Sequence, residues 1–216
     1  MFSLISWNIR GLGSSTKQQQ LRDLINKHEA KFVFICETKM QGINNVFCSK
    51  IWNIRELEFR SVDAKGLSGG LLLLWDGSKF IFSRSCSNRN WILIEGSFGD
   101  SSDKLCICCV YGDRSLERRL AMWNELRSLK ASFSSPWLLV GDLNETLSME
   151  DSRSNRIYNR GAGALKSFID FMHLGEFPLQ DCRFTWANSI YSSRIDRAFA
   201  QPEWSLRFRF LNLTTG

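Results

Sequence analysis

A carboxylate and an amide follow a short apolar segment of the sequence, with a spacing that suits phosphate or metal chemistry. Asp142 and Asn144 come directly after Trp137–Gly141, which reads as a buried strand because it is apolar and too short for a helix. Side chains two residues apart on an extended chain point the same way, so the pair should leave one face. Gly141 would let the backbone pack closely just before them. Burying this pair costs free energy unless both groups are used, which predicts a functional role.

Other polar side chains are expected at or just beyond the ends of further strands. They are Asn8, Glu37, Tyr111 and Asp196. Glu37 alone could be a solvated strand terminus, and Tyr111 an ordinary aromatic. Asp196 could instead pair with Arg194 or Arg197. Taken together, oxygen ligands and amides without a His or Cys cluster suit a hard cation such as Mg²⁺, held by few carboxylates, water and phosphate.

The elements that must position these residues follow from hydrophobic periodicity. Phe2–Trp7 and Phe32–Cys36 are predicted strands, and the helical pattern between them predicts a crossover. Such a connection makes the strands a parallel pair, with Asn8 and Glu37 at the same end. The Gln41–Lys65 segment reads as polar and less regular, with a candidate strand at Phe59–Val62.

The later elements alternate between strands and helices. The predicted strands are Leu71–Trp75 with a hairpin return at Lys79–Arg84, a meander of Trp91–Phe98 and Leu105–Val110, then Phe184–Trp186 and Arg194–Ala200. Helices are predicted over Leu116–Phe133 and before a capping Gly175. Two sets of strands, each completed from both halves of the chain and with helices outside, predict an α/β sandwich.

Length and composition indicate an ordinary globular protein. The 216 residues are 44% hydrophobic and 23% charged, which predicts one domain over residues 1–216 with a real core. The net charge of +6 is a modest lean toward polyanionic partners.

The cysteines and the N-terminal segment indicate the cellular compartment of the protein. Seven Cys form no regular framework, and Cys106, Cys108 and Cys109 read as buried free thiols, which fits a reducing compartment. Asn8 and Arg10 interrupt the first apolar run too early for a signal peptide. No apolar stretch approaches the roughly 20 residues that span a membrane. We expect an intracellular protein, nuclear or cytoplasmic, not secreted, without a membrane partner and monomeric.

Five short motifs occur in an order that resembles a known family. They are Trp7-Asn8-Ile9-Arg10-Gly11, Cys36-Glu37-Thr38-Lys39, Val110-Tyr111-Gly112, Gly141-Asp142-Leu143-Asn144 and Ser193-Arg194-Ile195-Asp196-Arg197. Together they resemble the endonuclease/exonuclease/phosphatase superfamily. The closer likeness is to the abasic-site-endonuclease-like domain of plant non-LTR (LINE-type) retrotransposons, to which Gly66–Gly70 and Phe184–Asn188 add. The resemblance covers nearly the whole chain, from Phe2 to about Phe210.

The resemblance implies a fold and an activity. The fold would be a four-layer α/β sandwich of two mixed sheets packed face to face, with helices outside. The activity would be Mg²⁺-dependent hydrolysis of a DNA phosphodiester, with Mn²⁺ as an alternative metal. Glu37 would hold the metal, and Asp142 would orient and deprotonate the attacking water. Three residues would position or hydrogen-bond the scissile phosphate: Asn8, Asn144 and Tyr111. Two would lie on the DNA side: Thr185 and Ser193.

The sequence departs from the family pattern near its end. Family members carry a Ser-Asp-His segment on a last strand, whose catalytic His is oriented by a strand Asp, here Asp196. This sequence has only His28 and His173, and neither lies in such a motif. Six residues follow Phe210, before that strand should begin. We therefore expect a C-terminally truncated domain, without its last strand and with impaired activity.

A basic loop provides a candidate substrate surface. Arg153, Arg156 and Arg160 lie in the polar segment after Asn144, where they could bind DNA phosphates without reading sequence. A solvated basic loop is the alternative.

Three functions remain open at this point. The first is a retrotransposon-derived, DNA-nicking endonuclease. The second is a non-catalytic retroelement remnant that binds nucleic acid weakly. The third is a phosphoesterase of small molecules such as inositol or nucleotide phosphates, which the retroelement features argue against.

Overall fold

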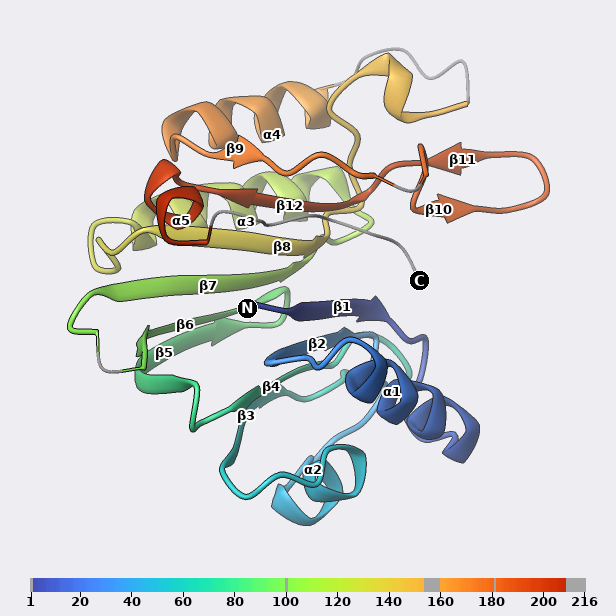
Figure 1. Cartoon of the computed structure of the whole chain (residues 1–216). Helices are drawn as coiled ribbons and strands as arrows, with labels where there is room; N and C mark the ends of the chain where they lie inside the picture. The colour runs from blue at the N-terminus through green and yellow to red at the C-terminus, as the bar shows by residue number, and fades with distance from the viewer. Residues whose placement is uncertain (1, 100, 154–159, 181, 209–216) are drawn as a thin grey trace. The chain divides into compact units, whose positions relative to one another are not determined.

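The computed structural model describes residues 2–99, 101–153, 160–180 and 182–208 (Figure 1). The chain forms two compact units, Met1–Cys109 and Val110–Gly216. The prediction of a single domain therefore stays a prediction.

The first unit is built on a four-stranded sheet with the order β1-β2-β4-β3. These strands are β1 (Leu4–Asn8), β2 (Phe32–Cys36), β3 (Leu57–Val62) and β4 (Leu71–Asp76). β1 and β2 are parallel, with Asn8 opposite Cys36, and α1 (Ser15–Lys27) connects them (Figure 1). The predicted crossover is confirmed, and it brings Asn8 and Glu37 to the same end of the sheet.

β2 is buried on both of its faces, as its uninterrupted apolar sequence predicts. Val33 belongs to the same hydrophobic cluster as Leu21 and Ile25 of α1. Phe32, on the opposite face, stacks edge-on with Phe80, the ring centroids being 5.3 Å apart. Phe80 begins β5 (Phe80–Asn88), which is followed by β6 (Trp91–Phe98) and β7 (Lys104–Tyr111). These three strands are neighbours in that order in the other sheet. The four-stranded sheet of this unit thus has helices on one face and strands on the other.

Two predictions within the first unit are wrong. The polar Gln41–Lys65 segment contains a helix, α2 (Asn45–Ile51), whose N-cap Asn44 accepts a hydrogen bond from the backbone N–H of Phe47. The turn at Asp76-Gly77 does not close a hairpin, because β4 already has β2 and β3 on its two edges. The turn instead leads into β5, which pairs with β6 in the other sheet.

The second unit contains the strand that carries Asp142. β8 (Trp137–Asp142) pairs antiparallel with β12 (Asp196–Ala200), and β12 pairs with the short β9 (Gly175–Glu176). α3 (Leu116–Leu129) packs on α4 (Arg160–Phe171), with the rings of Trp123 and Phe168 4.9 Å apart. The remaining elements are β10 (Trp186–Ala187), β11 (Ser192–Ser193), the 3₁₀ turn η1 (Met149–Asp151) and α5 (Pro202–Arg207).

The end of α4 differs from the sequence prediction. His173, with φ of 53°, takes the left-handed conformation that follows the helix. Gly175 is not the capping residue, because it lies in β9 and pairs with Ala200. The left-handed position therefore falls two residues earlier than the glycine suggested.

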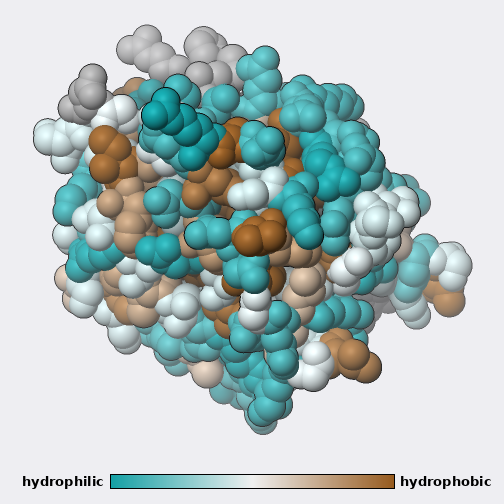
Figure 2. Space-filling view, turned by 90° about the horizontal axis from the view of Figure 1, so that it is seen from below, coloured by the Kyte–Doolittle hydropathy of each residue, from teal (hydrophilic) through white to brown (hydrophobic). Residues whose placement is uncertain are grey.

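The predicted fold class is confirmed: the fold is mixed α/β, with two large mixed sheets and helices. All seven cysteines are free, and burial raises the pKa of the Cys108 and Cys109 thiols well above the usual range. The face in Figure 2 is largely hydrophilic over its described residues, with hydrophobic side chains scattered among them. Among the helices of the described ranges, none is long and apolar enough to cross a membrane.

Candidate functional site

In the first unit, Glu37 is held by its backbone. The residue follows β2 and has φ of 54°, a left-handed conformation that a non-glycine residue adopts only under constraint. Its carbonyl accepts a hydrogen bond of 2.7 Å from the N–H of Gly11, in the loop after β1. The next residue, Thr38, donates its N–H to the carbonyl of Gly70 at 3.1 Å. Glu37 is thus fixed between two glycine-bearing loops, while its side chain stays half-exposed.

The glycines of the Gly66–Gly70 loop are explained by how closely the loop approaches Thr38. Gly70 has φ of 87°, and a Cβ there would lie 2.2 Å from Oγ1 of the fully buried Thr38. Its neighbour Gly69 accepts a hydrogen bond from the N–H of Lys39. The glycines therefore allow this loop to approach the segment that carries Glu37.

Asn8 ends β1 beside the segment that carries Glu37, since the N–H of Ile9 donates to the carbonyl of Cys36 at 3.1 Å. The loop after it is closed by Lys17, whose Nζ donates to the carbonyls of Ile9 and Arg10 at 2.6 and 3.0 Å. The Lys17 ammonium is therefore engaged by this loop.

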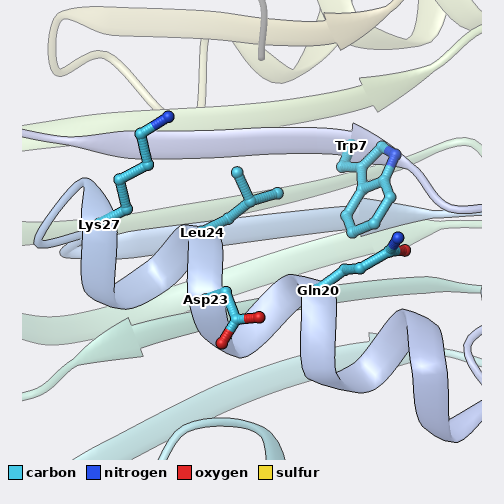
Figure 3. Close-up of a pocket in the computed structure, with 5 residues that line it drawn as sticks. All are labelled: Trp7, Gln20, Asp23, Leu24 and Lys27. Carbon is cyan, nitrogen blue, oxygen red and sulfur yellow. The ribbon is translucent and has the colours of Figure 1, made fainter.

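A separate open pocket of about 360 Å³ lies between α1 and β1 (Figure 3). It is lined by Trp7, Gln20, Asp23, Leu24 and Lys27. Trp7 precedes Asn8, and successive side chains of a strand point to opposite faces. The pocket therefore lies on the helix-covered face of β1, away from the Asn8 side chain.

In the second unit, two acidic residues lie side by side at the ends of paired strands. Asp142 on β8 is the register partner of Asp196 on β12, and residues directly opposite have Cβ atoms about 5 Å apart. Asp142 is buried, with 5% of its surface exposed, and Asp196 is half-buried. We call these two residues the carboxylate pair.

The alternative explanation for Asp196, an ion pair with Arg194 or Arg197, is wrong. Arg197 pairs with Asp151 and Glu176 on the opposite face of β12. Arg194 also pairs with Glu176, at 2.6 Å. Neither arginine therefore neutralises Asp196.

Thr185 is the described side chain that holds Asp196. Its Oγ1 accepts hydrogen bonds from the N–H groups of Ile195 and Asp196, at 3.1 and 3.0 Å. Burial raises the pKa of the Asp196 carboxyl, and the hydrogen bond from the Thr185 side chain opposes that rise. Thr185 also donates its N–H to the carbonyl of Ser193, which ties the β10–β11 ribbon to this strand. Thr185 thus lies at Asp196, and Ser193 is connected to it through the backbone bond with Thr185.

Asn144 meets Asp142, but not through the extended geometry that its spacing suggested. Asn144 has φ of 48°, so the chain turns after β8, and its N–H donates to Oδ1 of Asp142 at 3.0 Å. Its side-chain Nδ2 donates to the carbonyl of Gly112 at 2.7 Å, next to Tyr111. Gly141 is needed for this approach, since a Cβ there would lie 2.0 Å from the carbonyl oxygen of Val110.

A buried ion pair that the sequence reasoning missed supports the same loops. Arg119 of α3 donates to Glu145 at 2.8 Å, and their side chains are 10% and 4% exposed. The same guanidinium donates to the carbonyls of Asp113 and Arg114, at 2.8 and 2.9 Å. One arginine therefore joins the loop after Tyr111 to the residue after Asn144.

The predicted basic loop is only partly described. Arg153 is exposed, its N–H donates to the carbonyl of Ser192, and its guanidinium lies over the ring of Phe184. Arg156 lies outside the described residues. Arg160 begins α4 and is exposed.

Both histidines lie far from the acidic residues of their own units. The carbonyl of His28 accepts a hydrogen bond from Ser3, which precedes β1, so this residue is at the end of β1 opposite Asn8. That strand is about 17 Å long. His173 follows Met172, whose carbonyl is bonded by Gln201, at the end of β12 opposite Asp196. His173 therefore cannot serve as a partner of Asp196 in this arrangement.

The donor set fits a metal with few protein ligands. Within the described residues, no group of three or more His, Cys, Asp or Glu side chains could hold a metal ion. Mg²⁺ is commonly held by one or two carboxylates and completed by water and phosphate. The exposed part of Glu37 therefore fits Mg²⁺ better than zinc, which requires three or four protein ligands.

Comparison with solved structures shows several proteins with the same fold. The endonuclease domain of TRAS1, a telomere-specific non-LTR retrotransposon, is 11% identical with a TM-score of 0.68, covering 94% of this chain and 86% of that one. The AP endonuclease LMAP from Leishmania major is 14% identical with a TM-score of 0.68, covering 93% and 79%. The 3' phosphatase NExo from Neisseria, solved bound to a product DNA hairpin, is 12% identical with a TM-score of 0.72, covering 95% and 89%.

The family follows from the sequence itself. Residues 5–216 match the model of the Endonuclease/Exonuclease/phosphatase family. Members of this family are hydrolytic nucleases and phosphatases, which agrees with acidic and amide side chains at strand ends. The chain belongs to the Endonuclease/Exonuclease/phosphatase family.

Proposed function

We propose that this chain is a Mg²⁺-dependent phosphodiesterase that nicks DNA. The observation that supports this most strongly is the carboxylate pair, Asp142 beside Asp196, with the N–H of Asn144 bonded to Asp142. Acidic side chains kept half-buried or buried at strand ends cost free energy, and a role in proton transfer explains that cost.

Each residue of the second unit has a defined role in this proposal. Asp142 takes the proton from the water that attacks phosphorus, and Asn144 holds that carboxylate in place. Tyr111 donates a hydrogen bond to a phosphate oxygen, where negative charge grows in the transition state. Asp196, held by Thr185, completes the acidic set.

The first unit supplies the metal ligand in the same reaction. Glu37 would hold Mg²⁺, and Asn8 ends the neighbouring strand, opposite the residue before Glu37. When bound, the metal ion polarises the phosphoryl oxygen. The rigid backbone on both sides of Glu37 suits a residue that must present one carboxylate in a fixed direction.

The origin is part of the proposal. We propose descent from the endonuclease domain of a plant non-LTR retrotransposon, on the strength of the five motifs and the glycine loop described above. The fold that this chain shares with the TRAS1 endonuclease domain agrees with that descent.

A second candidate function is nucleic-acid binding without catalysis. The observation that favours it is the position of His173, at the end of β12 opposite Asp196. A hydrolase that requires an imidazole beside Asp196 would then be inactive with this set of side chains.

Nicking of supercoiled plasmid separates the two candidates. We expect nicking with Mg²⁺ and none with EDTA, and loss of nicking in Glu37→Ala and Asp142→Asn. Asp170→Asn, an exposed change on α4, is the matched control and should keep the wild-type rate. A version extended with a Ser-Asp-His strand tests the need for an imidazole. Nicking only in that version would support the second candidate for the present chain, and no nicking in either would refute the endonuclease proposal.

A further inference from the structure

Two arginines and one aromatic ring form a cluster next to the carboxylate pair. The guanidinium carbons of Arg153 and Arg183 each lie 5.3 Å from the ring centroid of Phe184. Both arginine side chains are exposed, and the phenylalanine is half-buried. Since both distances are measured from one ring, the two positive groups are no farther apart than twice that distance. We call Arg153, Phe184 and Arg183 the arginine cluster.

Neighbouring segments hold this cluster in place. Arg183 donates to the carbonyl of Glu150 at 3.1 Å, and the N–H of Arg153 donates to the carbonyl of Ser192 at 3.0 Å. Phe184 directly precedes Thr185, which hydrogen-bonds the backbone and side chain of Asp196. The cluster is therefore fixed one residue away from a side chain that holds the carboxylate pair.

The charges of the arginine cluster have no acidic partner among the described residues. Within the described residues, neither Arg153 nor Arg183 has a carboxylate within ion-pair distance. Four other arginines of the second unit do form ion pairs: Arg118, Arg119, Arg194 and Arg197. Two like charges on one ring repel each other, and a cation–π contact at an exposed site is weak. An anion placed between them would relieve that repulsion.

We infer that the arginine cluster grips the phosphodiester backbone of the DNA strand. Guanidinium groups bind phosphate oxygens through two parallel hydrogen bonds, and charges along one strand repeat every 3.4 Å or so, which suits two neighbouring arginines. The ring of Phe184 already carries two cations and is not a free stacking platform for a base. The cluster therefore contributes affinity without sequence preference.

The inference rests on the proposed function only because it takes DNA as the ligand. It can be tested by measuring DNA binding in the absence of cleavage. Fluorescence anisotropy of a labelled 30-base-pair duplex would be measured in EDTA over a series of NaCl concentrations. Arg153→Ala and Arg183→Ala should each weaken binding roughly tenfold and reduce the slope of log K against log[NaCl] by about 1. Two duplexes of unrelated sequence should give the same losses.

Two further variants separate the effect of the arginine charges from the effect of the ring that positions them. Lys166→Ala removes one exposed charge from α4 of the same unit and should leave affinity within about twofold of wild type. Phe184→Leu keeps both charges but removes the ring, so it should weaken binding while leaving the salt slope near the wild-type value. Arg153→Ala, Arg183→Ala and Lys166→Ala should keep the wild-type urea midpoint, since these three side chains are exposed.

Four results decide whether the inference stands. Wild-type affinity and slope in Arg183→Ala would overturn the inference, as would an equal loss in Lys166→Ala. Nicking by the wild type without any arginine effect would refute this inference alone. Conversely, an arginine effect on binding with no nicking would refute the proposed catalysis and leave the inference standing.

Discussion

The two units position their candidate residues by different means. In the first, the backbone fixes the residue: Gly11 donates to the C=O, and Gly70 accepts from the N–H, of the peptide group that follows Glu37, and Glu37 has φ of 54°. In the second, side chains do most of it: Asn144 reaches Gly112 and Thr185 holds Asp196. The first region should therefore be sensitive to lost glycines, and the second to lost polar or charged partners.

The largest effect is expected from the buried ion pair of the second unit. Arg119→Met would leave the Glu145 carboxylate buried without its partner, which costs about 3–5 kcal/mol of unfolding free energy. The double variant Arg119→Met with Glu145→Leu should recover most of that loss, because no unpaired charge remains. Urea denaturation followed by tryptophan fluorescence measures both. A loss below about 1 kcal/mol in the single variant would show that side-chain pairing does not hold this region.

Glycine substitutions compare the two regions directly. Gly141→Ala should cost about 2–4 kcal/mol, because its φ is 143° and its Cβ would meet the backbone oxygen of Val110. Gly70→Ala should cost roughly 1–3 kcal/mol, because it meets a side-chain hydroxyl that can rotate. Gly13→Ala, with open space around it, is the control and should stay within about 0.5 kcal/mol of wild type.

The glycine comparison can also fail in an informative way. If Gly70→Ala were as mild as Gly13→Ala in urea denaturation, the backbone around Glu37 would not be constrained as described. If it also left metal-dependent nicking unchanged, the contrast between the two units would be lost.

The smallest effect concerns the dependence of stability on pH. Burial raises the pKa of Asp196 in the folded chain above the value of about 3.9 expected when unfolded. The folded state then binds this proton more tightly, so the free energy of unfolding falls as pH rises from about 4 through the folded pKa. Asp196→Asn should remove that fall and be more stable than wild type above the window. Urea midpoints between pH 4 and pH 7 measure this, and identical pH slopes would contradict the shifted pKa.

Much of the first unit was predictable from sequence because its strands are apolar and bounded by polar turns. Phe32–Cys36 coincides with β2, and the strand–helix–strand order placed Asn8 and Glu37 at one end. The sheet that the strand after Asp76 joins was not predictable, because the sequence of a turn does not determine the pairing partner of the next strand. A free edge on β4 would have allowed the predicted hairpin, but β2 and β3 occupy both.

In the second unit, the carboxylate and amide were found, but their supports were not. The left-handed turn at Asn144 depends on contacts with Gly112 that no local pattern shows. Arg119 did leave a signal: it lies three residues after Leu116 and four before Trp123, on the apolar stripe of its helix. A charged residue on such a stripe indicates a buried partner, which is Glu145 here.

The central claim is that both regions act in one reaction, and a double-variant cycle on the single-turnover rate of DNA nicking with Mg²⁺ tests it most directly. Glu37→Gln and Asp142→Asn should each lower the rate by roughly 100-fold or more. Residues that act together lose activity non-additively, so the double variant should be little slower than the slower single variant. Losses that multiply in the double variant, or a wild-type rate in either single variant, would contradict the account.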